Sequence, residues 1–440
     1  MNIVKLLDIA KQKQVDPCQF TQETSSSFSC SLFKGKLDSY KISSTTNISV
    51  KGIYNGKVGT AFSTIDDNSN IDYLIDTVIE TATLNEKSDN AFLFEGSKKY
   101  KKIKTFNKEL SNISKKEKIA LLTKLEKAIY ESDDRISNLN LTYAERGAVN
   151  KFYNTYGLKL NDTSNYYYIF VEGTAKNKDS DNVVSGYHIF IDNDFSKFNF
   201  DEFVKTFKDN IVSKLNVGTI KTGKYKVLMK PDASASLIQA LVSHLSVEEV
   251  VKGSSLLANK LNTQALSKKL TISEKPLLNT YSGISFDNEG VATYNKLLIK
   301  KGVPLLYLNN LEYAKKLNTE PTGNGYGEGS KVGIDFTNLF VKPGSYNFDD
   351  VLKGIKKGVY ITGVSGLHAG LNAKSGDFNL QAEGFNIENG KITTALNLVV
   401  LSGNLFDMFN NILKVCNDSK DLEQINLPSI LFKKLNVSCQ

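Results

Sequence analysis

The sequence predicts an α+β fold in two domains, an N-terminal antiparallel sheet with helices and a C-terminal β-rich domain. First, 440 residues are too many for one ordinary hydrophobic core. Second, the first half alternates strand-like runs with apolar residues at helical spacing. Third, the chain beyond residue 270 is rich in glycine and strand-forming residues. A lysine- and glycine-rich stretch over residues 218–224 separates the two patterns. We therefore predict domains over residues 1–217 and 218–440.

The helices of the first half are predicted from apolar spacing and capping residues. Residues 2–13 form a short amphipathic helix, and Ile75 and Val78 share one face of a helix over residues 71–84. Ser114 is a suitable N-cap for a helix over residues 115–130. A further helix is predicted over residues 200–215.

The strands of the first half are predicted from runs of β-branched and aromatic residues. An Asn-Gly pair at residues 55–56 is typical of a two-residue hairpin turn. Residues 143–157 are interpreted as strand, turn and strand, a simple hairpin. The predicted strands cover residues 26–33, 39–53, 58–63, 136–142, 150–154, 166–173 and 183–190.

The second half begins with a buried-type strand over residues 225–229, and Pro231 starts a helix that we extend to about residue 251. From residue 270 onward the pattern is strand-like. One later helix is predicted over residues 405–414.

The composition indicates a soluble globular protein without a membrane span. Hydrophobic residues make up 40% of the chain and charged residues 23%. No apolar run approaches the roughly 18 residues that a spanning helix needs. The first residues resemble an amphipathic helix and not a secretory signal, so we expect a cytoplasmic location. The four cysteines (Cys18, Cys30, Cys416 and Cys439) form no C-x-x-C pair, which favours free thiols.

The net charge of +8 raises the question of nucleic-acid binding. A basic run covers residues 98–104, but the positive charge is spread thinly and comes almost entirely from lysine. Arg135 and Arg146 are the only arginines, whereas base recognition relies on the bidentate guanidinium. A solvated lysine surface is the favoured interpretation, and nucleic acid is not an expected partner.

A zinc hydrolase usually places two histidines on one helical face. This chain has three histidines, His188, His244 and His368, and no two of them stand at that spacing. A local zinc helix is therefore excluded, and we predict no metal ligand in the chain. His244 has Glu248 four residues on, which we interpret as a helix-surface pair and not as a catalytic base.

The densest group of candidate site residues lies in residues 366–390, which combine five glycines with His368, Asn372 and Asp377. Glycine at this density lets the backbone approach a ligand closely. A second glycine-rich loop, residues 322–329, contains Asn324 and lacks the features of a phosphate-binding loop. We predict that these four side chains bind substrate and that no residue is catalytic. His368 as a group that ties a turn to the sheet is the competing interpretation, and a Ser365–His368–Asp377 triad is disfavoured.

Several blocks resemble, in order, those of the TldD/PmbA family, two-component metallopeptidases also called modulators of DNA gyrase. The matching blocks are VKGIYNGKVGT (residues 50–60), GKYKVLM (223–229), KGSSLL (252–257), SFDNEGV (285–291), TGNG (322–325), TNL (337–339), the block containing His368, and LSGNL (401–405). The resemblance spans almost the whole chain. It implies an α+β fold of the TldD/PmbA type.

The resemblance also implies which of the two family branches the chain fits. The TldD branch carries an H-E-x-x-x-H zinc helix, and the corresponding positions here are approximately Ile238, Gln239 and Ser243. His244 is one place off the second ligand. The late cysteine of that branch is missing, because Cys416 and Cys439 fall outside its block. The chain is more similar to the TldE/PmbA branch, which lacks the metal.

That branch implies a non-catalytic, metal-free subunit of a cytoplasmic heterodimeric metallopeptidase acting on unfolded or small peptides. Zinc is then expected in a TldD-like partner subunit, and a homodimer is the alternative assembly. Whether the chain is itself an enzyme is left open. Two other functions are kept as alternatives, a regulatory binding protein of the DNA-gyrase-modulator type and an autonomous hydrolase using His368.

Overall fold

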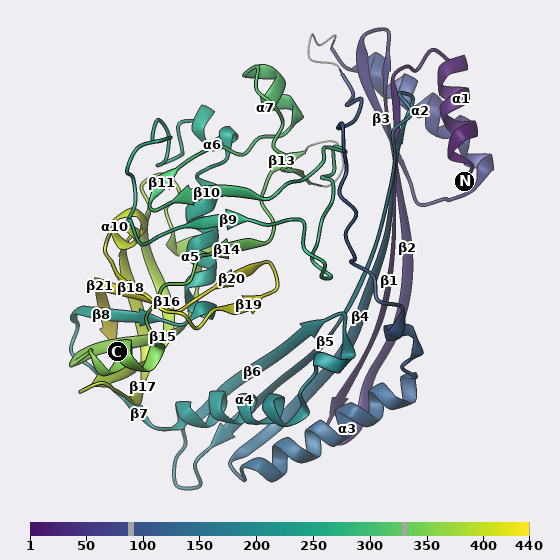
Figure 1. Ribbon diagram of the computed structural model, residues 1–440. Helices are drawn as coiled ribbons and strands as arrows, with labels where there is room; N and C mark the ends of the chain where they lie inside the picture. The colour runs from purple at the N-terminus through teal and green to yellow at the C-terminus, as the bar shows by residue number, and fades with distance from the viewer. Residues whose placement is uncertain (87–91, 328–331, 440) are drawn as a thin grey trace. The chain divides into compact units, whose positions relative to one another are not determined.

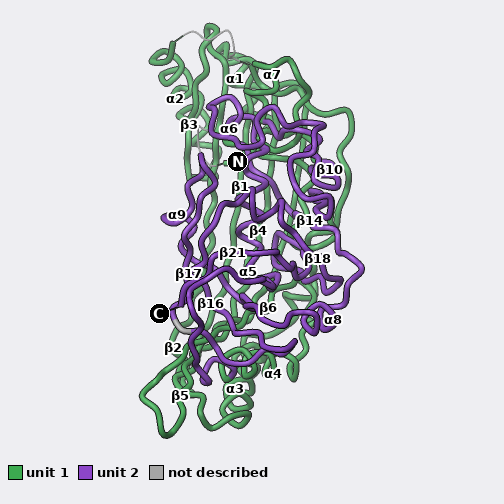
Figure 2. The backbone as a smooth tube through the Cα atoms, turned by 90° about the vertical axis from the view of Figure 1, so that its left-hand side faces the viewer, with its two compact units in different colours: residues 1–212, 277–293, 310–333 green, residues 213–276, 294–309, 334–440 purple. Residues whose placement is uncertain are grey.

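The computed structural model describes residues 1–86, 92–327 and 332–439. The chain divides into two compact units (Figure 2). Unit 1 comprises residues 1–212, 277–293 and 310–333, and unit 2 comprises residues 213–276, 294–309 and 334–440. The domain boundary at residues 217 and 218 stays a prediction. Among the described residues, none of the helices is both long and apolar enough to cross a membrane.

Unit 1 is built on one antiparallel six-stranded sheet, as predicted (Figure 1). Its long strands follow from the continuous runs of β-branched, aromatic and hydroxyl-bearing residues. In spatial order the strands are β3 (Lys57–Ser63), β2 (Lys36–Tyr54), β1 (Cys18–Phe33), β4 (Ile136–Asn154), β5 (Lys159–Lys176) and β6 (Val183–Asp192). The Asn55-Gly56 turn joins β2 to β3 with both residues at positive φ, as a two-residue hairpin requires.

The predicted hairpin over residues 143–157 is wrong, because β4 continues through most of that segment. Every residue from Tyr143 to Tyr153 pairs with β5, and the same residues pair with β1 on the other side. Gly147, within this segment, is a strand residue at a close approach, since a Cβ there would lie 2.8 Å from Oγ of Ser26. Two-sided pairing overrode the local turn signal.

The helices of unit 1 match their capping signals. The Asn2 side chain accepts from the backbone N–H of Lys5 at the start of the first helix, and Ser114 forms a reciprocal capping box with Glu117. The helices are α1 (Ile3–Gln12), α2 (Ile71–Leu84), α3 (Lys115–Ser132), α4 (Phe200–Val212) and α7 (Leu311–Lys316), with 3-10 turns η1 (Asn68–Asn70), η2 (Lys108–Asn112) and η3 (Phe195–Lys197).

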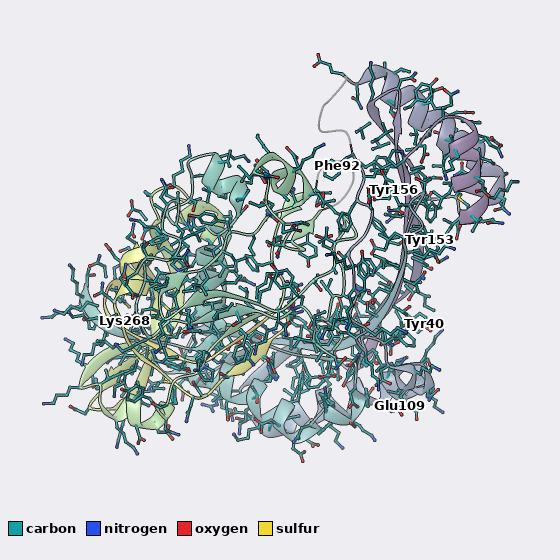
Figure 3. All side chains as sticks on the ribbon, turned by 45° about the horizontal axis from the view of Figure 1, so that its top comes forward. Tyr40, Phe92, Glu109, Tyr153, Tyr156 and Lys268 are labelled. Atoms are coloured by element: carbon teal, nitrogen blue, oxygen red, sulfur yellow. The ribbon has the colours of Figure 1, made fainter. Side chains whose placement is uncertain are left out.

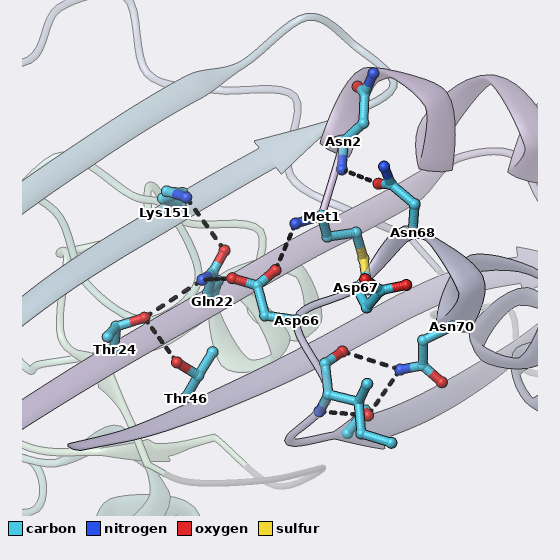
Figure 4. Close-up of polar contacts among 12 residues, drawn as sticks. Met1, Asn2, Gln22, Thr24, Thr46, Asp66, Asp67, Asn68, Asn70 and Lys151 are labelled. Atoms are coloured by element: carbon cyan, nitrogen blue, oxygen red, sulfur yellow. Dashed lines mark hydrogen bonds and ion pairs between the residues drawn. The ribbon is translucent and has the colours of Figure 1, made fainter. Parts of the chain in front are cut away.

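A polar network ties the N-terminus of unit 1 to its sheet (Figure 4). The Met1 ammonium lies 2.7 Å from Oδ1 of Asp66, whose other oxygen accepts from the Gln22 side chain. Lys151 donates to Gln22 from β4. The ammonium holds the pKa of the Asp66 carboxyl below its usual range. The network ties the residue before α1 to strand β1 through Asp66 and Gln22. It lies next to the apolar cluster to which α1, α2 and β1 contribute.

Unit 2 contains two sheets and is β-rich, as predicted, which confirms the α+β fold class. In the larger sheet, β17 pairs with β21 as well as with β16, so that five strands close into a ring. Its order is β18 (Ile412–Val415), β21 (Ile430–Cys439), β8 (Gly223–Met229), β15 (Lys357–Ser365), β16 (Asp377–Glu388), β17 (Lys391–Asn404) and β7 (Val217–Gly218). The smaller sheet has the order β11 (Val303–Pro304), β10 (Lys296–Lys300), β9 (Ile272–Glu274), β14 (Leu339–Val341), β20 (Ile425–Leu427) and β19 (Lys420–Leu422).

One central helix, α5, packs on these sheets and contributes Leu237, Ile238 and Leu241 to the main core of unit 2. The helix predicted from Pro231 to residue 251 is broken at His244 into two. The helix predicted over residues 405–414 ends at Asn410, because strand β18 begins at Ile412. The helices are α5 (Pro231–Ser243), α6 (Val247–Val251), α8 (Phe348–Lys353), α9 (Leu367–Gly370) and α10 (Leu405–Asn410), with the 3-10 turn η4 (Ser213–Leu215). Two further short strands are β12 (Gly325–Tyr326) and β13 (Gly333–Ile334).

Candidate functional site

The glycine-rich block forms the connection from β15 through α9 to β16. Gly366 caps α9 with a φ of +80°, a conformation that glycine adopts without strain. Gly370 ends the helix where a Cβ would lie 2.3 Å from the backbone oxygen of Asn379. An isolated bridge then pairs Leu371 with Phe378. These contacts hold the connection tightly against β16.

The structure places Asn372 and Asp377 together at an open cavity of about 410 Å³. His368 stands exposed on the adjoining helix α9. The cavity is lined by Ala369, Gly370, Leu371, Asn372, Asp377, Phe378 and Asn379. Three of the four predicted site residues, His368, Asn372 and Asp377, therefore belong to the connection between β15 and the start of β16 in unit 2.

The side chains of Asn372 and Asp377 also stabilise this loop. Oδ1 of Asn372 accepts from the backbone N–H groups of Lys374 and Ser375 at 2.9 and 3.1 Å. Oδ1 of Asp377 accepts from the Asn404 side chain at 3.0 Å, which lowers the pKa of the Asp377 carboxyl. Asn372 uses its oxygen in this way, and among the described residues none accepts a hydrogen bond from its amide N–H₂ group, which could donate to a ligand.

Asn324, the fourth predicted site residue, belongs to unit 1. Its side chain is buried, and it lies between Gly323, at a φ of +69°, and Gly325. Residues 328 and 329 of the same predicted loop lie outside the described residues. The substrate-binding role of all four side chains stays a prediction.

The buried Asp287 and the partly buried Glu289 anchor two segments near Asn324. Asp287 accepts backbone N–H groups from Glu289 and Val291 within its own turn, and a third from Gly325. Glu289 accepts from the backbone N–H of Leu311 at the start of α7. Burial, reinforced by the Glu289 charge, raises the pKa of Asp287 to about 7, although the three N–H donors oppose the shift.

Helix α5 does not offer a zinc site at the positions that the family motif implies. Ile238 is fully buried in the apolar core, and the side chains of Gln239 and Ser243 carry an amide and a hydroxyl. His244 is buried against the Phe406 ring, and burial lowers its pKa. Among the described residues, no group of three or more His, Cys, Asp or Glu side chains could hold a metal ion. The residues present do not fit zinc, which requires nitrogen, sulfur or carboxylate ligands.

The interpretation of His244 and Glu248 as a pair on a helix surface is wrong, because His244 is buried at the end of α5. In the structure Glu248 pairs with Lys252 at 2.6 Å. Nδ1 of His244 accepts from the backbone N–H of Leu256 at 3.4 Å, and the His244 carbonyl accepts from the Ser255 hydroxyl. His244 therefore closes the turn after α5.

Comparison with known proteins identifies the class to which this fold belongs. Models of the PmbA/TldA metallopeptidase domain 1, central domain and C-terminal domain match residues 22–82, 108–215 and 222–439. The chain therefore belongs to the PmbA/TldD metallopeptidase family, as its motifs predicted.

Individual relatives agree with that assignment. The metalloprotease PmbA homolog of Buchnera aphidicola is 30% identical over 337 residues, which cover 74% of this chain and 71% of that protein. The crystal structure of a putative modulator of DNA gyrase from Thermotoga maritima is 30% identical, with a TM-score of 0.91 and 99% of each chain covered. TldE from Thermococcus kodakarensis shares the fold, with a TM-score of 0.89 at 21% identity and 99% of each chain covered.

Proposed function

We propose that this chain is the TldE/PmbA-like, metal-free subunit of a cytoplasmic heterodimeric metallopeptidase that degrades unfolded or small peptides. A TldD-type partner subunit supplies the zinc ion and the general base. The observation that carries the proposal is the content of α5, where an apolar core residue, an amide and a hydroxyl occupy the positions of the family's zinc motif.

Each of these residue types is unsuited to zinc chemistry. The Ile238 side chain has no lone pair to donate, and it lies fully buried among Leu237, Leu241 and their neighbours. An amide such as that of Gln239 does not take a proton from metal-bound water. His244 stands one residue after the position of the second zinc ligand. Because successive helical residues are about 100° apart around the axis, a side chain at 244 points in a different direction from one at 243. The metal chemistry therefore belongs to another chain.

The contribution of this chain is to hold the peptide. The loop around Asn372 and Asp377 is fixed by its own hydrogen bonds, and it borders an open cavity. Extended peptides are commonly held by added main-chain hydrogen bonds, and side-chain pockets select among them. We assign substrate contacts to His368, Asn372 and Asp377 on this loop and to Asn324.

The test of the assembly is native mass spectrometry of the chain purified from its own host, followed by peptidase assays. We expect a 1:1 complex with a second polypeptide of similar size that carries zinc. We also expect peptide cleavage by the complex, its loss on chelation and its absence from the lone chain. Cleavage by the lone chain that survives chelation would instead support the autonomous hydrolase using His368, and a metal-free homodimer with no peptidase activity would contradict the proposal.

The test of the substrate surface uses the reconstituted complex. Replacing His368, Asn372 and Asp377 together, by Ala, Asp and Asn respectively, is expected to raise KM for an unfolded peptide at least about tenfold, since each lost hydrogen bond contributes about 1 kcal/mol. Asp at position 372 keeps the acceptor that stabilises the loop and removes the amide donor. Lys374→Ala, on the same loop, is the matched control and should leave KM unchanged. An unchanged KM in the triple variant would refute the assignment.

The second candidate function is regulatory binding of the DNA-gyrase-modulator type. It is favoured by the likeness to the Thermotoga maritima protein, which is described as a putative modulator of DNA gyrase. Only two arginines are available for direct DNA contacts. Binding of purified gyrase by the chain, without peptidase activity in any complex, distinguishes this function from the first.

A further inference from the structure

Exposed lysines that are far apart in the sequence meet on one face of the larger sheet in unit 2. Strand β8 lies between β21 and β15 (Figure 1). Its inner face contributes Tyr225 and Val227 to the main core, so that the alternate residues Lys224 and Lys226 face outward. Both lysines are exposed. The outer face of β8 is therefore cationic where the strand begins.

The neighbouring strands add three more exposed lysines at the same level. Lys433 and Lys434 are the residues of a bulge in β21, and both stand opposite Lys226. On the other side of β8, the parallel pairing with β15 places Lys356, which directly precedes β15, beside Lys224. These five side chains are called the lysine patch below.

The lysine patch lacks compensating negative charge. None of its five ammonium groups forms an ion pair with a described residue, whereas Lys353 of the nearby α8 pairs with Asp350. The strand register places one carboxylate, Glu388, opposite Lys357 on the far side of β15. Like charges gathered in this way repel one another, and a bound polyanion would relieve that repulsion.

Further lysines border the patch beyond β21. The Lys269 ammonium donates to the carbonyl of Ile412 in β18, and the backbone N–H of Lys433 donates to the carbonyl of Asn411, one residue earlier. Lys268, labelled among the side chains of unit 2 in Figure 3, is exposed. The cationic surface therefore continues past β21 toward β18.

The basic run that is visible in the sequence, residues 98–104, is built differently. It is a single segment of unit 1 outside the helices and strands. Its five exposed lysines follow one another along one chain and are not brought together by strand pairing. In the lysine patch, neighbouring strands about 4.8 Å apart place lysines side by side. The two groups contain the same number of lysines, so the run offers a matched control.

The composition of the lysine patch favours a duplex phosphate backbone as its partner. Protein interfaces are depleted of lysine and use Tyr, Trp and Arg as anchors. Single-stranded nucleic acids are held largely by stacking on aromatic side chains, and stable membrane anchoring adds apolar or lipid groups to a basic patch. The patch offers ammonium groups alone. A duplex presents closely spaced phosphates that bind through positive charge alone.

We propose that the lysine patch binds the phosphate backbone of double-stranded DNA without sequence preference. The scarcity of arginine disfavours base readout, but phosphate contacts require charge and not a bidentate fork. The charges that are spread thinly along the sequence are concentrated by the pairing of β21, β8 and β15. The contact is independent of the proposed peptidase function, because no patch residue lines the cavity at Asn372.

The salt dependence of binding measures the number of phosphates contacted. A fluorescently labelled duplex of random sequence is titrated with the full chain, and binding is followed by anisotropy. The slope of log K against log salt concentration should be about −4.5, since each of about five contacts contributes about 0.9. The affinity should accordingly fall about 500-fold between about 50 and 200 mM salt.

Variants of equal net charge separate the patch from general attraction. The patch variant carries Gln at all five patch positions, and the control variant carries Gln at five positions of the basic run, so each loses five positive charges. The patch variant should bind DNA at least tenfold more weakly and lose most of the salt slope. The control variant should keep the affinity to within about threefold. The control positions are Lys98, Lys99, Lys101, Lys102 and Lys104.

A third variant with Arg at the five patch positions keeps the charge and should keep the binding, and circular dichroism verifies that all three variants fold. Equal loss of affinity in the two Gln variants would overturn the proposal, because net charge alone would then explain the binding. A salt slope near zero in the unaltered chain would also overturn it. Binding to phosphatidylserine vesicles but not to the duplex, abolished in the patch variant, would assign the patch to a membrane surface instead.

Discussion

Lys296→Met is expected to lower the free energy of unfolding by about 3–5 kcal/mol, because it breaks a fully buried ion pair with Glu274. The Lys296 ammonium lies 3.0 Å from Oε2 of Glu274, and neither side chain has any exposed surface. The other oxygen of Glu274 accepts from the backbone N–H of Thr337. Denaturant titration followed by circular dichroism measures the change.

A second substitution separates the ion pair from the packing at this position. Adding Glu274→Gln to Lys296→Met replaces the buried carboxylate by a neutral amide, which can still accept the hydrogen bond from the backbone N–H of Thr337. The double variant should recover most of the lost stability, since replacing both partners of a buried pair is often nearly neutral. Lys127→Met breaks an exposed pair with Glu131 and should cost less than about 1 kcal/mol. Equal losses for Lys296→Met and Lys127→Met would show that the Glu274–Lys296 pair is hydrated in solution.

Ile238→Ala is expected to lower the free energy of unfolding by about 2–5 kcal/mol, because Ile238 is fully buried and its truncation leaves a cavity in the main core of unit 2. Ile238→Val removes one methylene group and should cost about 0.5–1.5 kcal/mol. The comparison bears on the proposed function, since the resemblance to the TldD branch places a zinc ligand at approximately this position.

Gln239→Ala is the matched control on the same helix. Gln239 is partly exposed, and alanine favours helix, so the change should stay within about 0.5 kcal/mol. The same denaturant titration measures both variants. If Ile238→Ala were as mild as Gln239→Ala, Ile238 would face solvent, and the argument that this side of α5 serves packing would fail.

The helices were predictable because their signals are local. Residues 71–84 were predicted and found as α2, and Ser114 caps α3 as expected. A cap and an apolar stripe lie within a few residues of one another, so no distant contact is needed to define them. The loop around Asn372 and Asp377 was predictable for the same reason, since only four residues separate them in the chain.

Other features depended on contacts that are distant in the sequence. The hairpin predicted over residues 143–157 was wrong, because pairing of Gly147 with Ser26 and Asn165 on its two sides continues β4 through this segment. Residues 277–293 join unit 1 through bonds such as that from the Tyr100 hydroxyl to the Gly290 carbonyl. No local sequence pattern predicts such partners, because neither of the two contacting segments carries a motif that specifies the other.

The sequence by itself determined the fold class, the family and the absence of a histidine zinc helix, because composition, motif order and residue counts need no coordinates. Only the tertiary structure decided that Ile238 is a core residue, that Asn372 and Asp377 share a cavity and that distant lysines meet on one sheet face. Burial and strand pairing are set by which distant segments meet. Which distant segments come into contact depends on the free energy of the whole folded chain and not on the local sequence alone.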